Sequence, residues 1–465
     1  MEKITFVIPS RNNLELLKLA YRSIIALEGE HHVLVLNDAS EDGTAEWLET
    51  VKDDRLHVHS NPGPERVGIV GMFDKGIEMA ETDIIMAFHA DMVAGKDLDK
   101  AILKHLERGK VVTATRIEPS LHPPGPEKVI EDFGLEPEEF DFDKWLEYKP
   151  PTNRVITQGI FAPWCMYKDD FLAIGGHDEL FAPQSREDSD LFNRFYLKGY
   201  ELLQTWEGFV YHFTSRGSRF NKYSGGDIGK DSPEWQDTNA KNMRNFFRKW
   251  KTNVQHDPYM LPIVDPIYDV GFVVNNCDLN ALSILEPWCD DIYSDWVGHK
   301  GFGVSKYIDE EQPRTTYDLS KKIHSDHIEP KNDIIVKFDA KNILHLWISD
   351  DPFKEFKPHP KTPIVISPKS ARMGGNILSL KNRIFRFGQN NEREYGQSLS
   401  VIEIKKLTPK DFLEKYIGTI KIDKYKGPHT INFNSKSKKI IFDFYVNKFS
   451  LFAGIRRIKT LLKRP

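Results

Sequence analysis

Short apolar runs alternate with amphipathic segments over the first 90 residues. The apolar runs cover residues 4–8, 33–36 and 84–88, and each one ends in polar residues. Apolar residues between the first two runs recur at helical spacing, at Leu14, Leu17, Ala20, Tyr21, Ile24 and Ile25. Such short, uniformly apolar runs are typical of strands buried on both faces. This order of strands and helices predicts an α/β fold, in which a mostly parallel sheet is flanked by helices.

Polar side chains follow two of these predicted strands. Asp38 comes directly after the second run, and His89-Ala90-Asp91 follows the third. The carboxyl ends of parallel strands share one edge of the sheet, which is where ligands bind in open α/β sheets. A carboxylate there can accept hydrogen bonds from a nucleoside, or hold a divalent cation and through it a phosphate. The alternative is structural, since Asp is common at the start of turns.

The chain changes character after residue 115. Residues 116–151 contain seven prolines and an acidic stretch, which predicts an insertion over the binding cleft that selects an acceptor. Gln158 and Trp164 follow, and we expect both to contact that acceptor, with Trp164 stacking on a sugar ring. A place for Trp164 in the core is the open alternative.

The sequence after residue 234 predicts how the rest of the chain divides into domains. A helix from Trp235 to Trp250 ends a first domain of residues 1–250, and an irregular extension covers residues 251–330. From residue 331 to 465, short β-type runs alternate with turns, which predicts a second, largely β domain. A basic amphipathic tail begins near Leu451. It is expected either to pack against its own domain or to lie on an anionic membrane surface.

Composition narrows these possibilities. With 465 residues, 40% of them hydrophobic and 29% charged, the chain is long enough for two globular domains. A net charge of −5 gives no argument for a nucleic-acid partner. The three cysteines form no metal-binding pair, which favours a reducing compartment. Since neither a signal peptide nor an apolar run of about 18 residues is visible, we expect a cytoplasmic protein, with peripheral membrane contact through the tail left open.

Several motifs in a fixed order resemble a known family. They are FVIPSRN at residues 6–12, VLNDASEDGT at 35–44, the glycines of 68–76, HAD at 89–91, GGHDE at 175–179 and REDSDL at 186–191. Together they resemble the GT-A fold of family 2 glycosyltransferases over roughly residues 1 to 220. The resemblance implies transfer of a sugar from a UDP- or GDP-sugar to a hydroxyl of a glycan, lipid-linked or protein-linked acceptor. It also implies a divalent cation, Mn²⁺ or Mg²⁺.

The resemblance assigns residues to the nucleotide-sugar. Pro9, Arg11 and Asp38 would line the nucleoside pocket. Gly68 begins a predicted helix, where a glycine lets the backbone approach a ligand closely. His89 stands where the family usually has the first Asp of its Asp-x-Asp motif. We therefore expect it to contact ribose or phosphate, although a role as a cation ligand stays open.

The resemblance also assigns the cation site and the catalytic base. Asp91 matches the last Asp of the Asp-x-Asp motif, whose carboxylate reaches the cation. His212 lies near the histidine that completes this site in some members, and a purely structural role is its alternative. Asp188 matches the base of inverting members, and Glu187 beside it would orient the loop or contact the acceptor. The alternative for both acids is a charged first helical turn, which the helix dipole favours.

Two other functions remain open. A nucleotidyltransferase of sugar phosphates would share the sheet and the phosphate-bound cation, although residues 9–13 lack the glycine- and Arg/Lys-rich loop expected there. A non-catalytic glycan-binding or scaffold protein is the other alternative, because His89 departs from the motif.

Overall fold

The computed structural model describes residues 2–443, except 122, 218, 296–302, 341–342, 345, 349–356, 392–396, 422–426, 429 and 435–438. The chain divides into two compact units. The first contains residues 1–267 and 313–316, and the second contains residues 268–312 and 317–465. The amphipathic tail that the sequence predicts after residue 450 lies outside the described residues.

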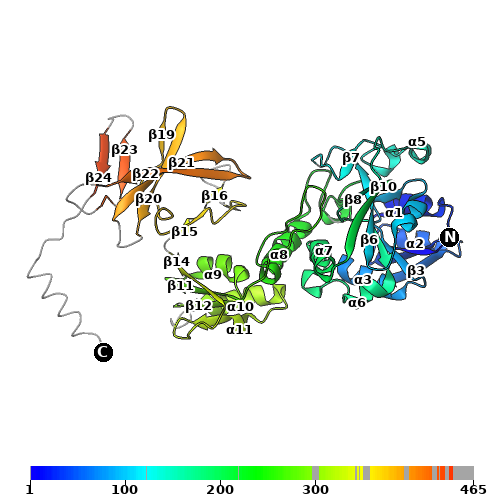
Figure 1. Ribbon diagram of the computed structural model, residues 1–465, viewed down its shortest axis with the longest axis horizontal. Helices are drawn as coiled ribbons and strands as arrows, with labels where there is room; N and C mark the ends of the chain where they lie inside the picture. The colour runs from blue at the N-terminus through cyan, green and yellow to red at the C-terminus, as the bar shows by residue number, and fades with distance from the viewer. Residues whose placement is uncertain are drawn as a thin grey trace, which may run out of the picture. The chain divides into compact units, whose positions relative to one another are not determined.

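One ten-stranded sheet organises the first unit, with the main order β3-β2-β1-β4-β9-β6-β10-β5 (Figure 1). Its strands are β1 (Ile4–Ser10), β2 (His32–Asp38), β3 (Leu56–Asn61), β4 (Ile84–Ala87), β5 (Met92–Ala94), β6 (Lys110–Glu118), β7 (Lys128–Ile130), β8 (Ile156–Gln158), β9 (Trp164–Tyr167) and β10 (Glu201–His212). Strand β1 pairs in parallel with β2 and β4, and β6 pairs in parallel with β10. Strands β5, β8 and β9 run antiparallel to their neighbours. The predicted mostly parallel sheet is therefore confirmed.

Helices connect these strands, and the first of them covers the residues where the apolar spacing predicts a helix. They are α1 (Leu14–Ile25), α2 (Thr44–Thr50), α3 (Ile69–Met79), α4 (Leu98–His105), α5 (Phe142–Glu147), α6 (Lys168–Ala173), α7 (Glu187–Lys198) and α8 (Pro233–Trp250). Helix α1 buries Leu17, Ala20 and Ile24 against the central strands, whose side chains are almost all buried. The apolar runs are buried on both faces because helices cover both sides of the sheet.

The insertion at residues 116–151 lies in a different place from the one predicted. Strand β7 and helix α5 belong to it, and Phe133, Phe140 and Trp145 pack with aromatic residues of β10 in one buried cluster. The Trp145 indole also donates a hydrogen bond to the Ala94 carbonyl at 2.9 Å. Of the described residues in this segment, Arg116 alone lines the cleft described below. Burial of aromatic surface therefore explains the segment, and acceptor selection does not follow from it.

The second unit begins with an α/β part where the sequence predicted an irregular extension. Four parallel strands, in the order β13-β12-β11-β14, form its sheet. The elements are β11 (Val270–Asn275), α9 (Leu279–Leu285), β12 (Asp291–Ser294), α10 (Gly303–Glu311), α11 (Leu319–Lys322), β13 (Ile323–Ser325) and β14 (Ile334–Asp339). Strands of three to six residues and helices of four to nine carry too few periods to be recognised from apolar spacing. The expectation of irregular structure therefore differs from what the chain forms.

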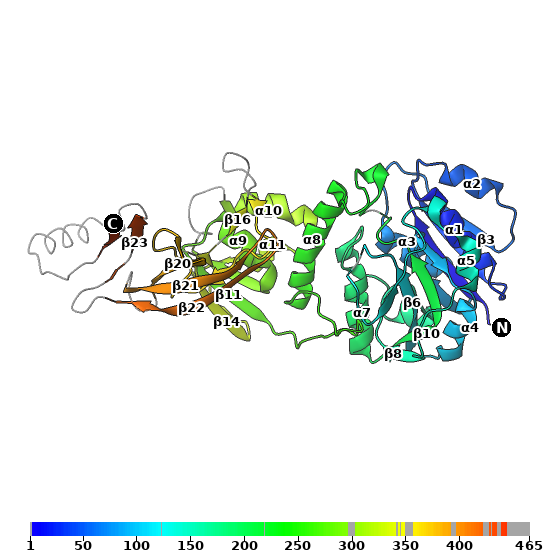
Figure 2. The same cartoon turned by 90° about the horizontal axis from the view of Figure 1, so that it is seen from above.

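The rest of the second unit is β-rich, as predicted. Strands β19 (Leu378–Leu380), β20 (Arg383–Asn390), β21 (Ser398–Leu407) and β22 (Phe412–Ile420) form an antiparallel sheet (Figure 2). Three short antiparallel pairs join β15 (Ile343–Leu344) to β18 (Val365–Ile366), β16 (Trp347–Ile348) to β17 (Lys357–Pro358), and β23 (Ile431–Asn434) to β24 (Lys439–Phe442). Among the residues described, no helix has the length and apolar character that crossing a bilayer requires.

Candidate active site

A cleft of about 570 Å³ opens at the carboxyl edge of the large sheet. Its wall is built by the ends of β1, β2, β4, β6 and β10 together with the first residues of α3 and α7. Nine of the predicted site residues line it: Pro9, Arg11, Asp38, Gly68, His89, Asp91, Glu187, Asp188 and His212. Residues from Pro9 to His212, about 200 positions apart in the chain, thus meet at the sheet edge where α/β folds bind ligands.

Asp38 organises the nucleoside end of the cleft. One carboxylate oxygen accepts hydrogen bonds from the Asn61 amide and the Val67 backbone N–H, both at 2.8 Å. The other accepts the Gly68 N–H at 2.7 Å. Asp38 therefore ties the 61–68 loop to the end of β2, a structural duty in addition to its predicted contact with a nucleoside.

Gly68 allows the backbone to pass close to the rest of the cleft wall. Its φ is +92°, a conformation that side chains disfavour. An added Cβ would also lie 2.3 Å from the Cβ of Pro183. Only glycine fits at this start of α3, because of its φ and of Pro183; its approach to a nucleotide-sugar stays a prediction.

Asp91 and His212 face each other across the cleft floor. His212 Nε2 lies 3.7 Å from Asp91 Oδ2, and both side chains are largely buried. Glu118 at the end of β6 lies behind the histidine, with its Oε1 at 2.7 Å from His212 Nδ1. An ionised carboxylate only accepts hydrogen bonds, so His212 Nδ1 donates to Glu118, and Nε2 is the nitrogen that faces Asp91.

Glu118 is fully buried yet ionised. Burial opposes its ionisation, but Arg116, His212 and Lys128 outweigh that effect and hold the pKa of Glu118 well below its ordinary range. The Lys128 ammonium lies 2.8 Å from Glu118 Oε2. Sequence reasoning missed Glu118 because β6 mixes apolar residues with threonines, a lysine and an arginine, so nothing in the spacing marks the glutamate at its end as buried.

The backbone around residue 216 fixes the orientation of Asp91. The Arg216 N–H donates to Asp91 Oδ2 at 2.8 Å, and the Phe213 N–H donates to the Asp91 carbonyl at 3.0 Å. The Arg216 guanidinium bonds the Leu135 carbonyl and lies 3.6 Å from Glu136. The Arg216 side-chain charge thus faces the 116–151 segment, while its backbone N–H binds Asp91 in the cleft.

His89 occupies the middle of the cleft, beside both of the key carboxylates. Burial lowers the pKa of His89, while the negative charges of Asp91 and Asp188 act in the opposite direction. The chain turns immediately after Phe88, with the Met92 N–H donating to the His89 carbonyl at 3.1 Å. His89 and Asp91 therefore reach the cleft from a turn, and not from the extended strand end that the sequence suggested.

Two acids begin α7 in different environments. Glu187 is 8% exposed, and its Oε2 is buried without a hydrogen-bond partner among the described residues. Burial and the neighbouring Asp188 charge raise the pKa of Glu187 to about 8. Asp188 is less buried and opens onto the cleft. At neutral pH Glu187 is thus mostly protonated.

Arginines supply positive charge that sequence reasoning did not identify. Arg66, Arg116 and Arg186 all line the cleft. Arg66 pairs with Glu234 at 2.8 Å, and Arg116 packs over the Phe161 ring at 4.1 Å. Burial lowers the pKa of Arg186, whose Nε has no hydrogen-bond partner among the described residues. Single arginines carry no spacing signal, so only the fold reveals that these three converge on the cleft.

The two predicted acceptor residues lie elsewhere. Trp164 is 1% exposed and packs in the core between the rings of Phe171 and Phe195, at centroid distances of 5.7 and 5.9 Å. Its stacking on a sugar is therefore excluded by burial. Gln158 is exposed at the end of β8 and is not among the residues that line the cleft.

Comparisons with known proteins divide along the same lines as the fold. Residues 5–161 match the family model described as Glycosyl transferase family 2. Residues 332–440 match the model described as Glucosamine inositolphosphorylceramide transferase 1, N-terminal.

The matches to individual proteins are partial. Glucosamine inositolphosphorylceramide transferase 1 of Oryza sativa subsp. japonica is 33% identical over 73 residues, which are 15% of this chain and 10% of that protein. Poly-beta-1,6-N-acetyl-D-glucosamine synthase of Staphylococcus aureus (strain COL) is 24% identical over 122 residues, or 26% and 29% of the two chains. The structure of a mannosyltransferase from Pyrobaculum calidifontis with GDP-Man and Mn²⁺ aligns with a TM-score of 0.35 and 16% identity, over 55% of this chain and 66% of that one. The chain thus covers less than a third of the two curated relatives.

Proposed function

We propose that this chain, whose residues 5–161 match the Glycosyl transferase family 2 model, is a glycosyltransferase that moves a sugar from a nucleotide-sugar to a hydroxyl group in a cation-dependent reaction with inversion. The observation that carries the proposal is the meeting of Asp91 and Asp188 in one cleft. Both carboxylates also act on the same His89 ring. A displacement at an anomeric carbon needs positive charge at the departing diphosphate, which a carboxylate-bound cation supplies, and a base at the acceptor hydroxyl. Two carboxylates on separate elements could supply these two functions.

Asp91 and His212 are the residues that would hold a divalent cation. Their donor atoms, one carboxylate oxygen and one imidazole nitrogen, suit Mn²⁺. The contact between His212 and Glu118 supports this assignment, because a carboxylate behind a histidine fixes the ring and aims its free nitrogen. When bound, the cation would stabilise the negative charge of the departing nucleoside diphosphate.

Asp188 would act as the base. It removes the proton from the acceptor hydroxyl as that oxygen forms its bond to the anomeric carbon and the bond to the diphosphate oxygen breaks. Its side chain lines the cleft from the first turn of α7, on a different element from Asp91. Glu187, mostly protonated at neutral pH, would donate a hydrogen bond to a substrate oxygen.

The diphosphate would lie among the arginines of the cleft. Arg11, Arg66 and Arg186 stand near the nucleoside end and the start of α7, where fixed positive charge offsets phosphate charge. Arg186 has the strongest claim of the three, since no carboxylate among the described residues lies within ion-pair distance of it. Arg66 already has Glu234 as a partner.

The acceptor would be a glycan or a lipid-linked sugar, and the second unit would take part in choosing it. The match of residues 332–440 to a module of a glycolipid-forming transferase supports this part of the proposal. Both curated relatives have an amino sugar in their names, which places UDP-linked amino sugars first among donors to test.

The test is a panel of UDP- and GDP-sugars incubated with the full chain, with and without Mn²⁺, and assayed for release of the nucleoside diphosphate. The proposal predicts Mn²⁺-dependent hydrolysis of at least one sugar nucleotide. It also predicts that Asp188→Asn slows release by at least about 10³-fold while nucleotide affinity stays within about threefold.

Asp169→Asn is the matched control, because Asp169 is also an acid in the first turn of a helix but does not line the cleft. If no nucleotide binds in the presence of Mn²⁺, the chain is a scaffold or glycan-binding protein. If Asp188→Asn abolishes nucleotide binding as well, the base has been misassigned.

A further inference from the structure

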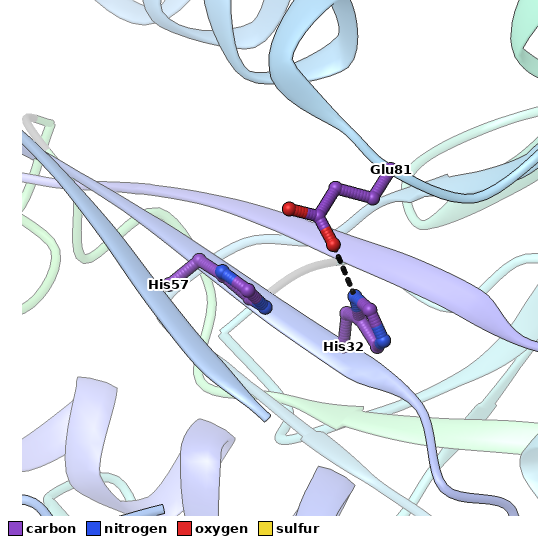
Figure 3. A group of neighbouring side chains, drawn as sticks. All are labelled: His32, His57 and Glu81. Atoms are coloured by element: carbon purple, nitrogen blue, oxygen red, sulfur yellow. Dashed lines mark ion pairs between the residues drawn. The ribbon is translucent and has the colours of Figure 1, made fainter. Parts of the chain in front are cut away.

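A second group of metal-ligating side chains lies on β2, β3 and the connection between α3 and β4. His32, His57 and Glu81 each offer one ligating atom, and these three atoms lie within 4.8 Å of one another. Figure 3 shows the imidazole rings side by side with the Glu81 carboxylate above them. The rings are stacked with centroids 5.1 Å apart, and His32 Nδ1 lies 3.8 Å from Glu81 Oε2.

This group lies at the opposite edge of the sheet from the cleft. His32 is the first residue of β2, and Glu81 precedes β4 by three positions, so both are at the amino ends of parallel strands. His57 is paired with Leu34 in the β2–β3 register, which puts its side chain on the same face as that of His32. Asp38, which lines the cleft, ends the same strand that His32 begins. The cluster is therefore independent of the proposed catalytic cation.

The histidine nitrogens in this cluster lack the partners that buried polar atoms require. His32 Nδ1 and His57 Nε2 are inaccessible to solvent and have no hydrogen-bond partner among the described residues. At 3.8 Å, Glu81 is too far from His32 for a hydrogen bond. Two unsatisfied buried nitrogens on one sheet face are unfavourable unless something else satisfies them.

Protonation does not readily compensate for the missing hydrogen-bond partners of these nitrogens. Burial lowers the pKa of His32, and the neighbouring His57 lowers it further. Two stacked imidazolium rings would repel each other. Neutral imidazoles are the form that binds metal ions, so this environment favours a metal over a proton.

We propose that His32, His57 and Glu81 form a binding site for Zn²⁺. Two imidazole nitrogens and one carboxylate oxygen are a common zinc ligand set, with a water in the fourth position. Tetrahedral Zn²⁺ with bonds of about 2.0–2.1 Å requires donors roughly 3.4 Å apart, so the group must contract slightly on binding. The Glu81 side chain, which is 67% exposed and has free torsions, can make that movement.

Bound Zn²⁺ would add a link between the edge strand β3, strand β2 and the connection that follows α3. Strand β3 is at the edge of the sheet, and Val58 at its centre is 42% exposed. The ion would hold this strand to β2 and to the end of α3. Helix α3 begins directly after Gly68, which lines the cleft. Zinc bound beyond the other end of α3 would therefore stabilise the helix that carries part of the nucleotide pocket.

Calorimetric titration of ZnCl₂ into the chelator-treated full chain tests the site. We expect the stoichiometry to fall by one equivalent in His32→Gln and in His57→Gln. His59→Gln is the matched control, because His59 lies two residues further along the same face of β3 and is not part of the cluster. Zinc at about 100 times its dissociation constant should raise Tm by roughly 5 °C in the wild type and in His59→Gln alone.

If either histidine variant fails to fold, Glu81→Gln decides, since its exposed side chain can change without disturbing the core. It should weaken zinc binding by more than the roughly 10–100-fold that loss of an indirect partner costs. Equal stoichiometry and equal Tm shifts in the wild type, His57→Gln and Glu81→Gln would overturn the proposal. Nucleotide binding with Mn²⁺ should be unchanged in all of these variants, which separates this site from the cleft.

Discussion

Glu118→Gln is the substitution that probes the proposed cation site without touching a cation ligand. Glutamine has nearly the shape of glutamate, but it carries no charge and its amide can offer N–H where the carboxylate only accepts. In the wild type, Glu118 accepts from His212 Nδ1 at 2.7 Å and so aims Nε2 at the cation position near Asp91. After the change, the ring loses its charged partner and its fixed orientation.

The size of the effect follows from the contacts of Glu118. Loss of a carboxylate behind a metal-bound histidine typically weakens metal affinity 10–100-fold, or about 1.4–2.7 kcal/mol. The substitution also leaves Lys128, 8% exposed, with a single carboxylate, since Glu127 lies 3.8 Å away. Removing one partner of a buried ion pair lowers the free energy of unfolding by about 3–5 kcal/mol. Because Lys128 keeps its contact with Glu127, we expect a loss of about 3 kcal/mol.

The assay is nucleotide binding by calorimetry as a function of Mn²⁺ concentration, performed well below Tm so that the loss of stability does not matter. We expect the Mn²⁺ concentration for half-maximal enhancement to rise 10–100-fold in Glu118→Gln. Glu127→Gln is the control, because Glu127 lies near the same Arg116 and Lys128 charges, at 3.8 Å from each, whereas His212 Nδ1 pairs with Glu118. An unchanged Mn²⁺ requirement in Glu118→Gln, or an equal rise in Glu127→Gln, would refute the reasoning.

Three further substitutions test other parts of the account. Glu187 keeps a proton in the folded chain up to about pH 8, whereas its ordinary pKa is 4.5, so the free energy of unfolding should fall as pH rises from 4.5 to 8. Glu187→Gln should remove this pH dependence of the free energy of unfolding, which amounts to at most about 5 kcal/mol. Chemical denaturation at pH 5 and pH 8 measures the difference, and an equal pH dependence in both proteins would contradict the burial argument. Gly68→Ala should lower Tm and weaken nucleotide binding, because the new methyl group meets Pro183 and strains the two N–H groups that hold Asp38; thermal unfolding and calorimetry check both, and wild-type values would show that the loop adapts. Trp164→Ala should lower the free energy of unfolding by about 3–5 kcal/mol with nucleotide affinity unchanged at low temperature, and a loss of acceptor affinity without a loss of stability would restore the stacking role.

The parts of the fold with strong local signals were predictable. The apolar runs at residues 4–8, 33–36 and 84–88 became β1, β2 and β4 because helices bury both faces of the sheet. Asp38 and Asp91 followed from the same reasoning, since polar residues that end parallel strands must meet at one edge. In contrast, the strands at residues 270–294 are short and were missed, although they build a second parallel sheet.

It was harder to predict which residues from distant parts of the chain come together in one site. Trp164 carried an equal sequence signal for core and for ligand, and the position of β9 between β4 and β6 decided in favour of the core. Glu118 acquires its role only through its contact with His212, which is 94 positions away in the chain. The cluster of His32, His57 and Glu81 was invisible for the same reason, because strand register alone brings the two histidines together.

The central claim is that two carboxylates have separate tasks in one cleft, and a paired comparison of Asp91→Asn and Asp188→Asn tests it most directly. The measurement is the affinity for UDP and GDP with and without Mn²⁺, by calorimetry on the two variants and the wild type. The account predicts that Mn²⁺ strengthens nucleotide binding in the wild type and in Asp188→Asn, and that this enhancement disappears in Asp91→Asn. Mn²⁺ enhancement that persists in Asp91→Asn, or that is lost in both variants, would contradict it.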